Sequence, residues 1–456
     1  MSVVAPSFPL TAGAARVSAQ PALDLPGADA VEVVLTASRT GLSRYARSEI
    51  TQNVVRNEVR AQVRVVIDHR VATAATNQLD PASMVATARR ALEAARVSPV
   101  DEEFPGLATP QRDGRAKGIF RWDETTAGAS PERRAQGVSD MLAVTHAKDA
   151  AGIFETSAHC FAVINSLGID CFDAFTRCIA TCLLHEGDAT GWGEASSHSI
   201  IDVDREAAAR TAASKAVRGH DPSEAEPGIY PVVLEPAAVA LLLDYLSYVG
   251  MGAKQVLDGE SFFATRAGEP VAAPTITIED DVYDDHSVGI GFDFEGVPRR
   301  KVCIIDGGRA VGPVTDLRTA PKLGVAPSGH FSGWTEYGPG ASNVVLHPGD
   351  ASMEELIGGV TDGFLVTRFH YVNVLDRPAT LMTGMTRDGT FRIRDGEIAE
   401  PVRNFRFTQS VLDALESTEA VGAEVAAFPP DFGSFGSFVA PALRVGRFNF
   451  ASTTTH

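Results

Sequence analysis

The chain has 456 residues, of which 44% are hydrophobic and 21% are charged. This length exceeds that of one average domain, so two domains are expected, and the composition is typical of a globular protein in water. The formal net charge of −18 argues against nucleic acid and anionic membranes as partners, because phosphate groups are bound by clustered Lys and Arg. No run of about 18 apolar residues is present, so no transmembrane helix is expected.

The N-terminus and the cysteines both bear on the cellular compartment. Residues 1–25 are rich in Ala, Pro and Ser and have no basic segment before an apolar core, which predicts a flexible tail rather than a secretory signal. The five cysteines are an odd number, which favours reduced thiols in a cytoplasm. They form no Cys-X-X-Cys pair, so small buried apolar fillers are expected rather than a structural zinc site.

Residues 26–225 are expected to form an α+β domain on an antiparallel sheet with flanking helices. Apolar and polar residues alternate along residues 59–67, the pattern of a half-buried strand. Asp80-Pro81 and Ser130-Pro131 each offer an N-cap followed by a first-turn proline, and they predict helices to about Val97 and Lys148. We also expect strands at 31–36, 153–157, 159–165 and 175–184, a turn at 187–193 and a helix at 204–217.

After a polar stretch at 218–229, residues 230–450 are expected to form a β-rich domain, barrel- or sandwich-like. Its first helix has an apolar stripe with the spacing of a core-facing helix, formed by Val239, Leu242, Leu243, Leu246 and Val249. Gly250 and Gly252 predict its end in a left-handed turn. Strands are expected at 232–234, 275–278, 291–294, 301–305, 309–311, 364–374, 381–387, 390–393, 398–402 and 442–448, a loop at 321–343, and helices after Ser352 and at 410–419.

Several segments resemble catalytic motifs but lack their context. His185-Glu186 is followed by Gly and Asp rather than by a second His one helical turn later, so a strand end is favoured over a zinc helix. Gly289-Ile290-Gly291 lacks the third glycine of a dinucleotide loop. Residues 433–437 read Gly-Ser-Phe-Gly-Ser, the wrong order for a serine hydrolase.

Two charged segments are interpreted as solvent-facing. The acidic residues at 280–286 lack the spacing of an EF-hand and are expected to form a solvated loop. The basic run at 299–301 is expected to lie at a solvated strand edge, since three residues are too few for a nucleic-acid surface. No constellation of residues in the chain therefore defines a catalytic site by itself.

Five segments of the C-terminal half, in order, resemble the TldD/PmbA (TldE) family of cytoplasmic metalloproteases. They are VVLEPAAVALLLDYLSYVGMGAKQVLDGESFF at 232–263, APTITIEDD at 273–281, FEGVPRRKVCIIDGGR at 294–309, HPGDASMEELIGGVTDGFLVTRF at 347–369 and TFRIRDGEIAEPV at 390–402. The resemblance implies two related chains that assemble into a protease. One of them, the TldD type, carries zinc on a helical HExxxH motif with a Cys near the C-terminus.

This chain departs from the zinc-binding pattern. The HExxxH positions fall on the first C-terminal helix, where Leu243 replaces the first His, Asp244 the Glu and Tyr248 the second His. Leu offers no lone pair, and a neutral Tyr is a poor zinc ligand. No Cys follows Cys303, and aromatic residues occupy the neighbourhood of Phe432. The resemblance therefore implies the metal-free TldE/PmbA type, with no cofactor in this chain and zinc in the partner.

The favoured hypothesis is a non-catalytic subunit that completes a peptide-binding cavity of a TldD-like, zinc-bearing chain, in a heterodimer or larger assembly that degrades or processes unfolded peptides. The family resemblance implies that peptide is held by β-strand addition, and Thr367, Arg368 and His370 are the candidate contacts with peptide or partner. One alternative is a peptide-binding or scaffold homologue without proteolysis. Another is a self-sufficient hydrolase, with His185, His198 and the cysteine cluster as first suspects.

Overall fold

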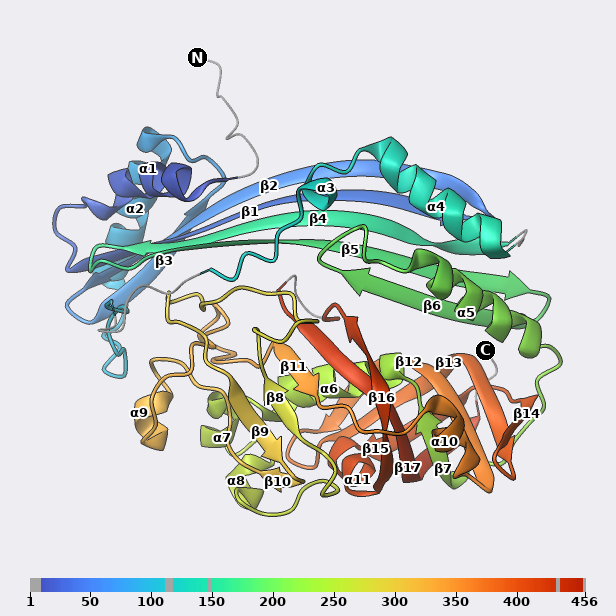
Figure 1. The fold of residues 1–456 in the computed structure, drawn as a ribbon. Helices are drawn as coiled ribbons and strands as arrows, with labels where there is room; N and C mark the ends of the chain where they lie inside the picture. Colours follow the sequence, from blue (N-terminus) through green and yellow to red (C-terminus); the bar gives the residue numbers. More distant parts are fainter. Residues whose placement is uncertain (1–9, 111–117, 146–148, 432–434, 454–456) are drawn as a thin grey trace.

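The N-terminal half is an arched, antiparallel six-stranded sheet that lies over the C-terminal half (Figure 1). The computed structural model describes residues 10–110, 118–145, 149–431 and 435–453. The strand order is β3-β2-β1-β4-β5-β6, with bounds Ala30–Ala46 (β1), Glu49–Ile67 (β2), Arg70–Thr76 (β3), Ala150–Asn165 (β4), Asp170–Glu186 (β5) and Ala189–Ser197 (β6). Its helices are α1 (Ala12–Leu23), α2 (Pro81–Val97), α3 (Glu124–Ala127), α4 (Pro131–Thr145) and α5 (Arg205–Arg218).

The C-terminal half is built on an 11-stranded mixed sheet with the main order β10-β9-β8-β11-β17-β15-β13-β12-β7. An additional pairing of β17 with β7 closes five strands, β17-β15-β13-β12-β7, into a ring, as in a small barrel. The bounds are Gly228–Leu234 (β7), Ile278–Asp280 (β8), Val302–Asp306 (β9), Arg309–Ala310 (β10), Asn343–Leu346 (β11), Asp362–Asp376 (β12), Leu381–Arg394 (β13), Glu397–Pro401 (β14), Phe405–Ser410 (β15), Thr418–Phe428 (β16) and Ser437–Thr453 (β17).

Helix α6 (Pro236–Gly250) is the central helix of this half. It packs against β12 and β17, and residues on almost every side of it are buried in the largest hydrophobic cluster of the described residues. A helix that is apolar all round is stable only inside a core. The shorter helices lie at the periphery: α7 (Ala253–Leu257), α8 (Phe263–Arg266), α9 (Ala320–Leu323), α10 (Met353–Gly358) and α11 (Val411–Glu416).

The α+β class and the antiparallel N-terminal sheet are confirmed, and so is the position of the core helix. The tail expected at residues 1–25 is wrong for residues 12–23, which form α1, capped by Thr11. Its buried residues Ala15, Ala19 and Ala22 recur every three or four positions and pack in the N-terminal core. The small size of alanine concealed this helical face from an interpretation based on large apolar residues.

Other local expectations also need correction. Residues 189–193, expected as part of a turn, belong to β6, and the turn itself is confined to the junction with β5. Residues 153–165 form one strand, β4, rather than two. The strand expected at 291–294 is limited to an isolated bridge between Phe292 and Pro298. Helix α6 ends without a left-handed residue, since its C-cap Met251 has φ −90°.

The strands β3, β11, β15 and β16 and the first half of β2 were not expected. Residues 49–58 of β2 are all exposed, so they show no alternation of apolar and polar residues. The expected end of α4 at Lys148 lies outside the described residues, as do Phe432, Gly433 and Ser434. Within the part of the chain that is described, no helix is both long and apolar enough to span a membrane.

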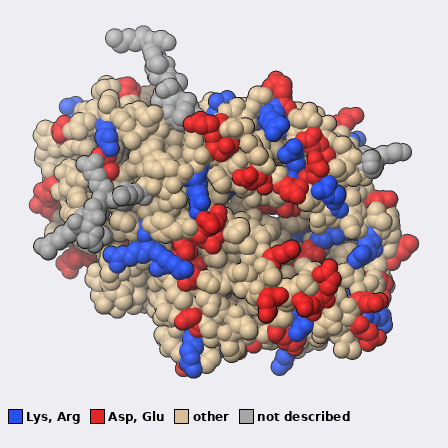
Figure 2. All heavy atoms as spheres, in the orientation of Figure 1, with Lys and Arg blue, Asp and Glu red and all other residues tan. Residues whose placement is uncertain are grey.

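The charged surface agrees with the acidic composition. In Figure 2, Lys and Arg side chains are scattered among Asp and Glu rather than gathered into one extended basic patch. The expected fillers Cys160, Cys171, Cys178 and Cys182 are buried and form no disulfide among the described residues. Burial raises the pKa of Cys160 to about 11 and that of Cys178 to about 12, so these thiols stay protonated near neutral pH.

Candidate functional site

The residues at the HExxxH positions of α6 do not converge on one point. Leu243 is 1% exposed and belongs to the apolar core. The Asp244 carboxylate accepts a hydrogen bond of 2.7 Å from the backbone N–H of Asp431, and burial raises its pKa to about 7. The Tyr248 hydroxyl accepts a hydrogen bond of 3.0 Å from Arg377, whose guanidinium also lies over the Tyr248 ring at 5.0 Å.

This arrangement does not fit a catalytic zinc ion. Such an ion takes three protein ligands with nitrogen, sulfur or carboxylate donors and leaves one position open. Leu243 has no donor, and the Tyr248 hydroxyl already interacts with a cation. Among the described residues, no group of three or more His, Cys, Asp and Glu side chains is arranged to hold a metal ion.

A cavity of about 1000 Å³ borders α6, and we call it the α6 chamber. Asp244, Tyr245 and Tyr248 of the helix line one side. The remaining wall is largely aromatic and aliphatic, with contributions from Phe294, Phe331, Trp334, Tyr337, Pro339, Val372, Val374, Leu375, Phe435 and Phe438. Two cationic side chains, Arg299 and Arg377, also line it. A largely apolar cavity with few polar groups has the composition of a ligand site.

One wall of the α6 chamber is a strand that lacks a neighbour on one side. Strand β7 pairs with β12 only over residues 364–366. Beyond Val366, the described residues pair β12 only with β13, and residues 372–375 of this stretch line the chamber. The Tyr245 hydroxyl donates a hydrogen bond of 2.7 Å to the Val372 carbonyl. An incompletely paired strand inside a cavity can accept another extended chain.

The three candidate contact residues of β12 have different environments. Thr367 is fully buried, and its hydroxyl has no hydrogen-bond partner among the described residues, so it is not accessible to a peptide in this conformation. Arg368 pairs with Asp388 and lies 4.8 Å over the ring of Trp192. His370 is half-buried, and burial, with the nearby cation Arg368, lowers its pKa. Of the three, Arg368 and His370 thus remain available for contact with a peptide or a partner.

A smaller cavity of about 160 Å³ is also lined by Asp244, together with Trp192, Glu194, Arg368 and Asp431. Burial raises the pKa of Glu194 to about 7, although Arg368 opposes this effect. Two carboxyl groups with pKa values of about 7, Glu194 and Asp244, therefore line the same small cavity beside α6. The sequence interpretation missed Glu194 because no element was expected between the turn at 187–193 and the helix at 204–217, whereas the structure places residue 194 in β6.

A Ser-His-Asp arrangement in the same half is closed. His330 lies 2.8 Å from Asp280 through Nε2 and 2.9 Å from the Ser328 hydroxyl through Nδ1, and all three residues are buried. The Ser328 hydroxyl also accepts from Thr315 N and donates to Thr315 O, so its single proton is engaged by a backbone carbonyl. None of the three residues lines the α6 chamber. They form a structural cluster rather than a nucleophilic site.

This cluster corrects the expectation of a solvated acidic loop at residues 280–286 for Asp280, whereas Asp285 and His286 are exposed as expected. Asp280 is 1% exposed and accepts hydrogen bonds from the backbone N–H groups of Ser342 and Asn343. Burial alone would raise the pKa of Asp280, but His330 and Arg299 outweigh that effect and hold it well below its usual value. Arg299 likewise is not at a solvated edge, because it is only 7% exposed.

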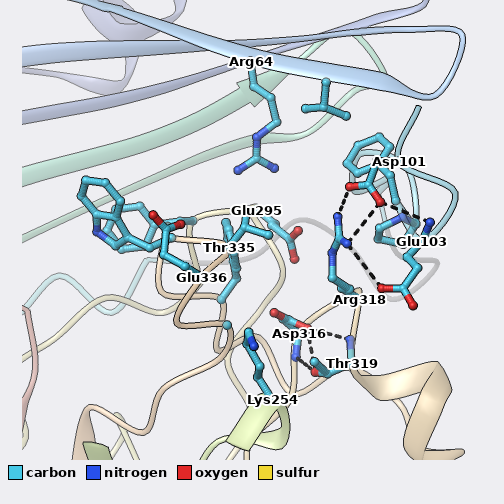
Figure 3. A pocket seen from close by; sticks show the side chains of 18 of the residues that line it. Arg64, Asp101, Glu103, Lys254, Glu295, Asp316, Arg318, Thr319, Thr335 and Glu336 are labelled. Carbon is cyan, nitrogen blue, oxygen red and sulfur yellow. Dashed lines mark hydrogen bonds and ion pairs between the residues drawn. The ribbon is translucent and has the colours of Figure 1, made fainter. Parts of the chain in front are cut away.

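A second large cavity, of about 610 Å³, lies between the N-terminal sheet and the C-terminal half. Figure 3 shows Arg64 pointing into it from β2, opposite Glu295, Asp316 and Lys254. Its basic groups all have acidic partners, in the pairs Arg64–Glu32, Arg318–Asp101, Lys322–Glu103 and Lys254–Asp258. Burial and the neighbouring Asp293 raise the pKa of Glu295. This cavity holds paired charges and is a less promising binding site than the α6 chamber.

The fold is an α+β architecture in which an arched antiparallel sheet covers a β-rich half with a central apolar helix. Residues 227–452 match the model of the PmbA/TldA metallopeptidase C-terminal domain, and residues 31–95 match that of PmbA/TldA metallopeptidase domain 1. The chain belongs to the PmbA/TldD family of metallopeptidase homologues.

Individual relatives agree with this assignment. A metalloprotease of Methanothermobacter thermautotrophicus is 29% identical over 228 residues, which cover 48% of this chain and 49% of the relative. A zinc metalloprotease TldD homolog of Saccharolobus solfataricus is 26% identical over 46% of each chain. The chain thus spans about half the length of the curated relatives that it matches.

The solved structure of TldE from Thermococcus kodakarensis has the same fold. It superposes with a TM-score of 0.83 at 20% identity, and the match covers 97% of this chain and all of that one. The two matched domain models confirm the family resemblance, and the solved TldE shows that the same fold extends over both halves of the chain.

Proposed function

We propose that this chain is the zinc-less subunit of a cytoplasmic TldD/TldE-like metalloprotease that degrades or processes unfolded peptides. Its α6 chamber would hold an extended peptide while a zinc-bearing, TldD-like partner performs hydrolysis. The observation that carries the proposal is the combination of a chamber of about 1000 Å³ with a helix that offers no zinc ligand at Leu243 and Tyr248.

The incompletely paired stretch of β12 supports the mode of binding. An extended peptide beside residues 368–375 would meet a strand that lacks a neighbour on that side. Main-chain hydrogen bonds recognise every peptide sequence, so this mode suits a protease of broad specificity. Arg368 and His370 would lie close to such a peptide, whereas the buried Thr367 would support the strand without contacting the peptide.

The first experiment combines metal analysis with reconstitution. The isolated chain is expected to contain no stoichiometric zinc and to leave an unfolded peptide intact, whereas a mixture with a zinc-bearing TldD-like chain should form a complex on size exclusion and hydrolyse the peptide. The variant Leu243→Ala in this chain should keep the activity of the mixture if it folds. Stoichiometric, tightly bound zinc in the isolated chain would contradict the proposal.

The second experiment tests the peptide-binding mode. A six-residue apolar peptide should bind to the isolated chain, and an analogue with N-methyl groups on alternate amides should bind at least about tenfold more weakly, because each lost hydrogen bond costs about 1 kcal/mol. Isothermal titration calorimetry measures both affinities. Equal binding of the two peptides would exclude strand addition and favour a side-chain-based mode.

A further inference from the structure

Arg299 differs from Arg377, the other cationic side chain of the α6 chamber, in its burial. The residue is 7% exposed but still forms part of the chamber wall. Its backbone is held by a hydrogen bond of 2.9 Å from Arg299 N to the Gly291 carbonyl, and its own carbonyl accepts from the Tyr283 hydroxyl at 3.0 Å. The guanidinium is therefore positioned by a fixed backbone rather than by a flexible surface loop.

The hydrogen-bonding capacity of this guanidinium is mostly unused. Nη1 donates to the Ser342 hydroxyl at 2.8 Å and lies 3.8 Å from Asp280. Nε is buried without a hydrogen-bond partner, and Nη2 makes no hydrogen bond or ion pair with the described residues. Removing a charged donor from water without a partner costs several kcal/mol. Such a group is retained at this cost where a ligand supplies the missing acceptor.

Asp280 does not fill that role. Its carboxylate already interacts with His330 and accepts from two backbone N–H groups, those of Ser342 and Asn343. At 3.8 Å from Nη1 it is beyond hydrogen-bond distance. The positive charge is thus partly balanced. Nε is enclosed without an acceptor, whereas Nη2 remains available.

Arg377 provides the contrast within the same chamber. It forms an ion pair of 3.1 Å with Glu260 and donates to the Tyr248 hydroxyl. Its side chain is 35% exposed, so water can satisfy the remaining donors. Two arginines thus line one cavity, and only the buried one has a buried donor without an acceptor.

We propose that Arg299 is the anion anchor of the α6 chamber and binds a carboxylate of the peptide. A guanidinium matches a carboxylate with two parallel hydrogen bonds, and the apolar walls contributed by Phe294, Phe331 and Phe435 strengthen such a contact by excluding water. The carboxylate comes from the C-terminus of the peptide or from an acidic side chain. This inference rests on the proposed function, because it assumes that the chamber holds a peptide.

The test compares three acetylated, six-residue apolar peptides on the full chain by calorimetry. One ends in a free carboxylate, one ends in an amide, and the third ends in an amide but contains a single aspartate. The free acid is expected to bind about ten- to a hundredfold more tightly than the plain amide. This ratio corresponds to the contribution of a hydrogen bond to a charged group. Tight binding of the third peptide would assign the anchor to acidic side chains as well.

Variants then assign the effect to one residue. Arg299→Gln should reduce the ratio of the two affinities to about one, and Arg299→Lys should restore only part of it, since an ammonium lacks the planar fork. The matched control Arg377→Gln should keep the full ratio. Thermal melts verify that each variant is folded. Because Arg299→Gln also removes a hydrogen bond to Ser342, the variant Ser342→Ala shows what that loss alone does.

The outcomes separate this proposal from the broader one. Equal affinities of acid and amide in the native chain, or an acid preference that survives in Arg299→Gln, overturn the anion anchor while peptide binding stands. If no peptide binds, titration with 3-phenylpropanoate decides whether the anion anchor is retained. Binding of this small aromatic acid that is lost in Arg299→Gln retains the anchor and rejects the peptide chamber. Absence of both kinds of binding rejects both.

Discussion

The Asp280–His330–Ser328 cluster and the wall of the α6 chamber are neighbours that share Ser342. The polar groups of the cluster all have hydrogen-bond partners, whereas some of those in the chamber wall do not. In the cluster, the carboxylate, the imidazole and the hydroxyl are buried and joined by hydrogen bonds of 2.7–3.0 Å. In the chamber wall, Arg299 has donors without acceptors, and burial raises the pKa of Asp244 to about 7.

The difference shows why a familiar set of residues is a weak guide to a site. The cluster has the composition of a catalytic triad, but it has neither access to a cavity nor a free serine proton. The chamber has no such motif, but it offers space, a strand with an open side and unsatisfied groups. Buried polar groups that are fully satisfied stabilise a fold, whereas an unsatisfied one beside a cavity needs a separate explanation, which for Arg299 is the proposed ligand.

The largest expected effect is that of His330→Ala in the cluster. This variant should lower the free energy of unfolding by about 3–5 kcal/mol, because it leaves Asp280 buried without its main partner. Because the pKa of Asp280 is lower in the folded chain than in the unfolded chain, its ionised form stabilises the fold at pH values above the unfolded pKa, and this stabilisation disappears as the pH falls. The destabilisation caused by His330→Ala should therefore be greatest near neutral pH.

Urea denaturation at pH 7 and at low pH measures the effect of His330→Ala. The control is His347→Ala, because His347 is 44% exposed and pairs with Glu279 at 2.6 Å. An exposed pair of this kind contributes about 0–1 kcal/mol. Equal losses in the two variants would contradict the structural role of the cluster.

A medium, pH-dependent effect is expected for Asp244→Asn in the chamber wall. With a folded pKa of about 7 and an unfolded pKa near 3.9, the folded chain binds more protons, so Asp244 lowers stability as the pH rises from about 4 to 7. The asparagine oxygen can still accept from Asp431 N. The variant should match the native chain near pH 4 and exceed it by about 1–3 kcal/mol at pH 8.

Denaturation curves at the two pH values test this prediction, with the exposed Asp202→Asn as the control. If the difference in the free energy of unfolding between the native chain and Asp244→Asn were the same at both pH values, Asp244 would ionise in the folded chain without a loss of stability. The chamber wall would then be more polar than its lining residues indicate.

The smallest effect is expected for Tyr248→Phe. Tyr248 is 39% exposed, and its hydroxyl interacts with Arg377 at the surface, so the stability should change by at most about 0.5 kcal/mol. The activity of a mixture with a TldD-like partner should be unchanged, as measured by peptide hydrolysis. Loss of that activity with normal folding and complex formation would give Tyr248 a role beyond packing on Arg377.

Some features of the cluster and of the chamber wall could be predicted from the sequence, and others could not. The stripe of Val239, Leu242 and Leu246 predicted the core helix, because helical periodicity is a local property. The basic run at 299–301 was interpreted as exposed, and this is right for Arg300 and Lys301 but wrong for Arg299. Nothing in three adjacent cations indicates which one turns inward, since that choice depends on Gly291, Ser342 and other distant segments.

The sequence by itself determined the α+β class, the central helix and the absence of zinc donors at Leu243 and Tyr248. These features follow from the periodicity and chemistry of neighbouring side chains. Only the tertiary structure decided that β12 runs past the end of β7, that Glu194 and Asp244 take up protons near neutral pH, and that Arg299 lines a cavity. Burial and open space arise where segments far apart in the chain meet, and no local pattern encodes that meeting.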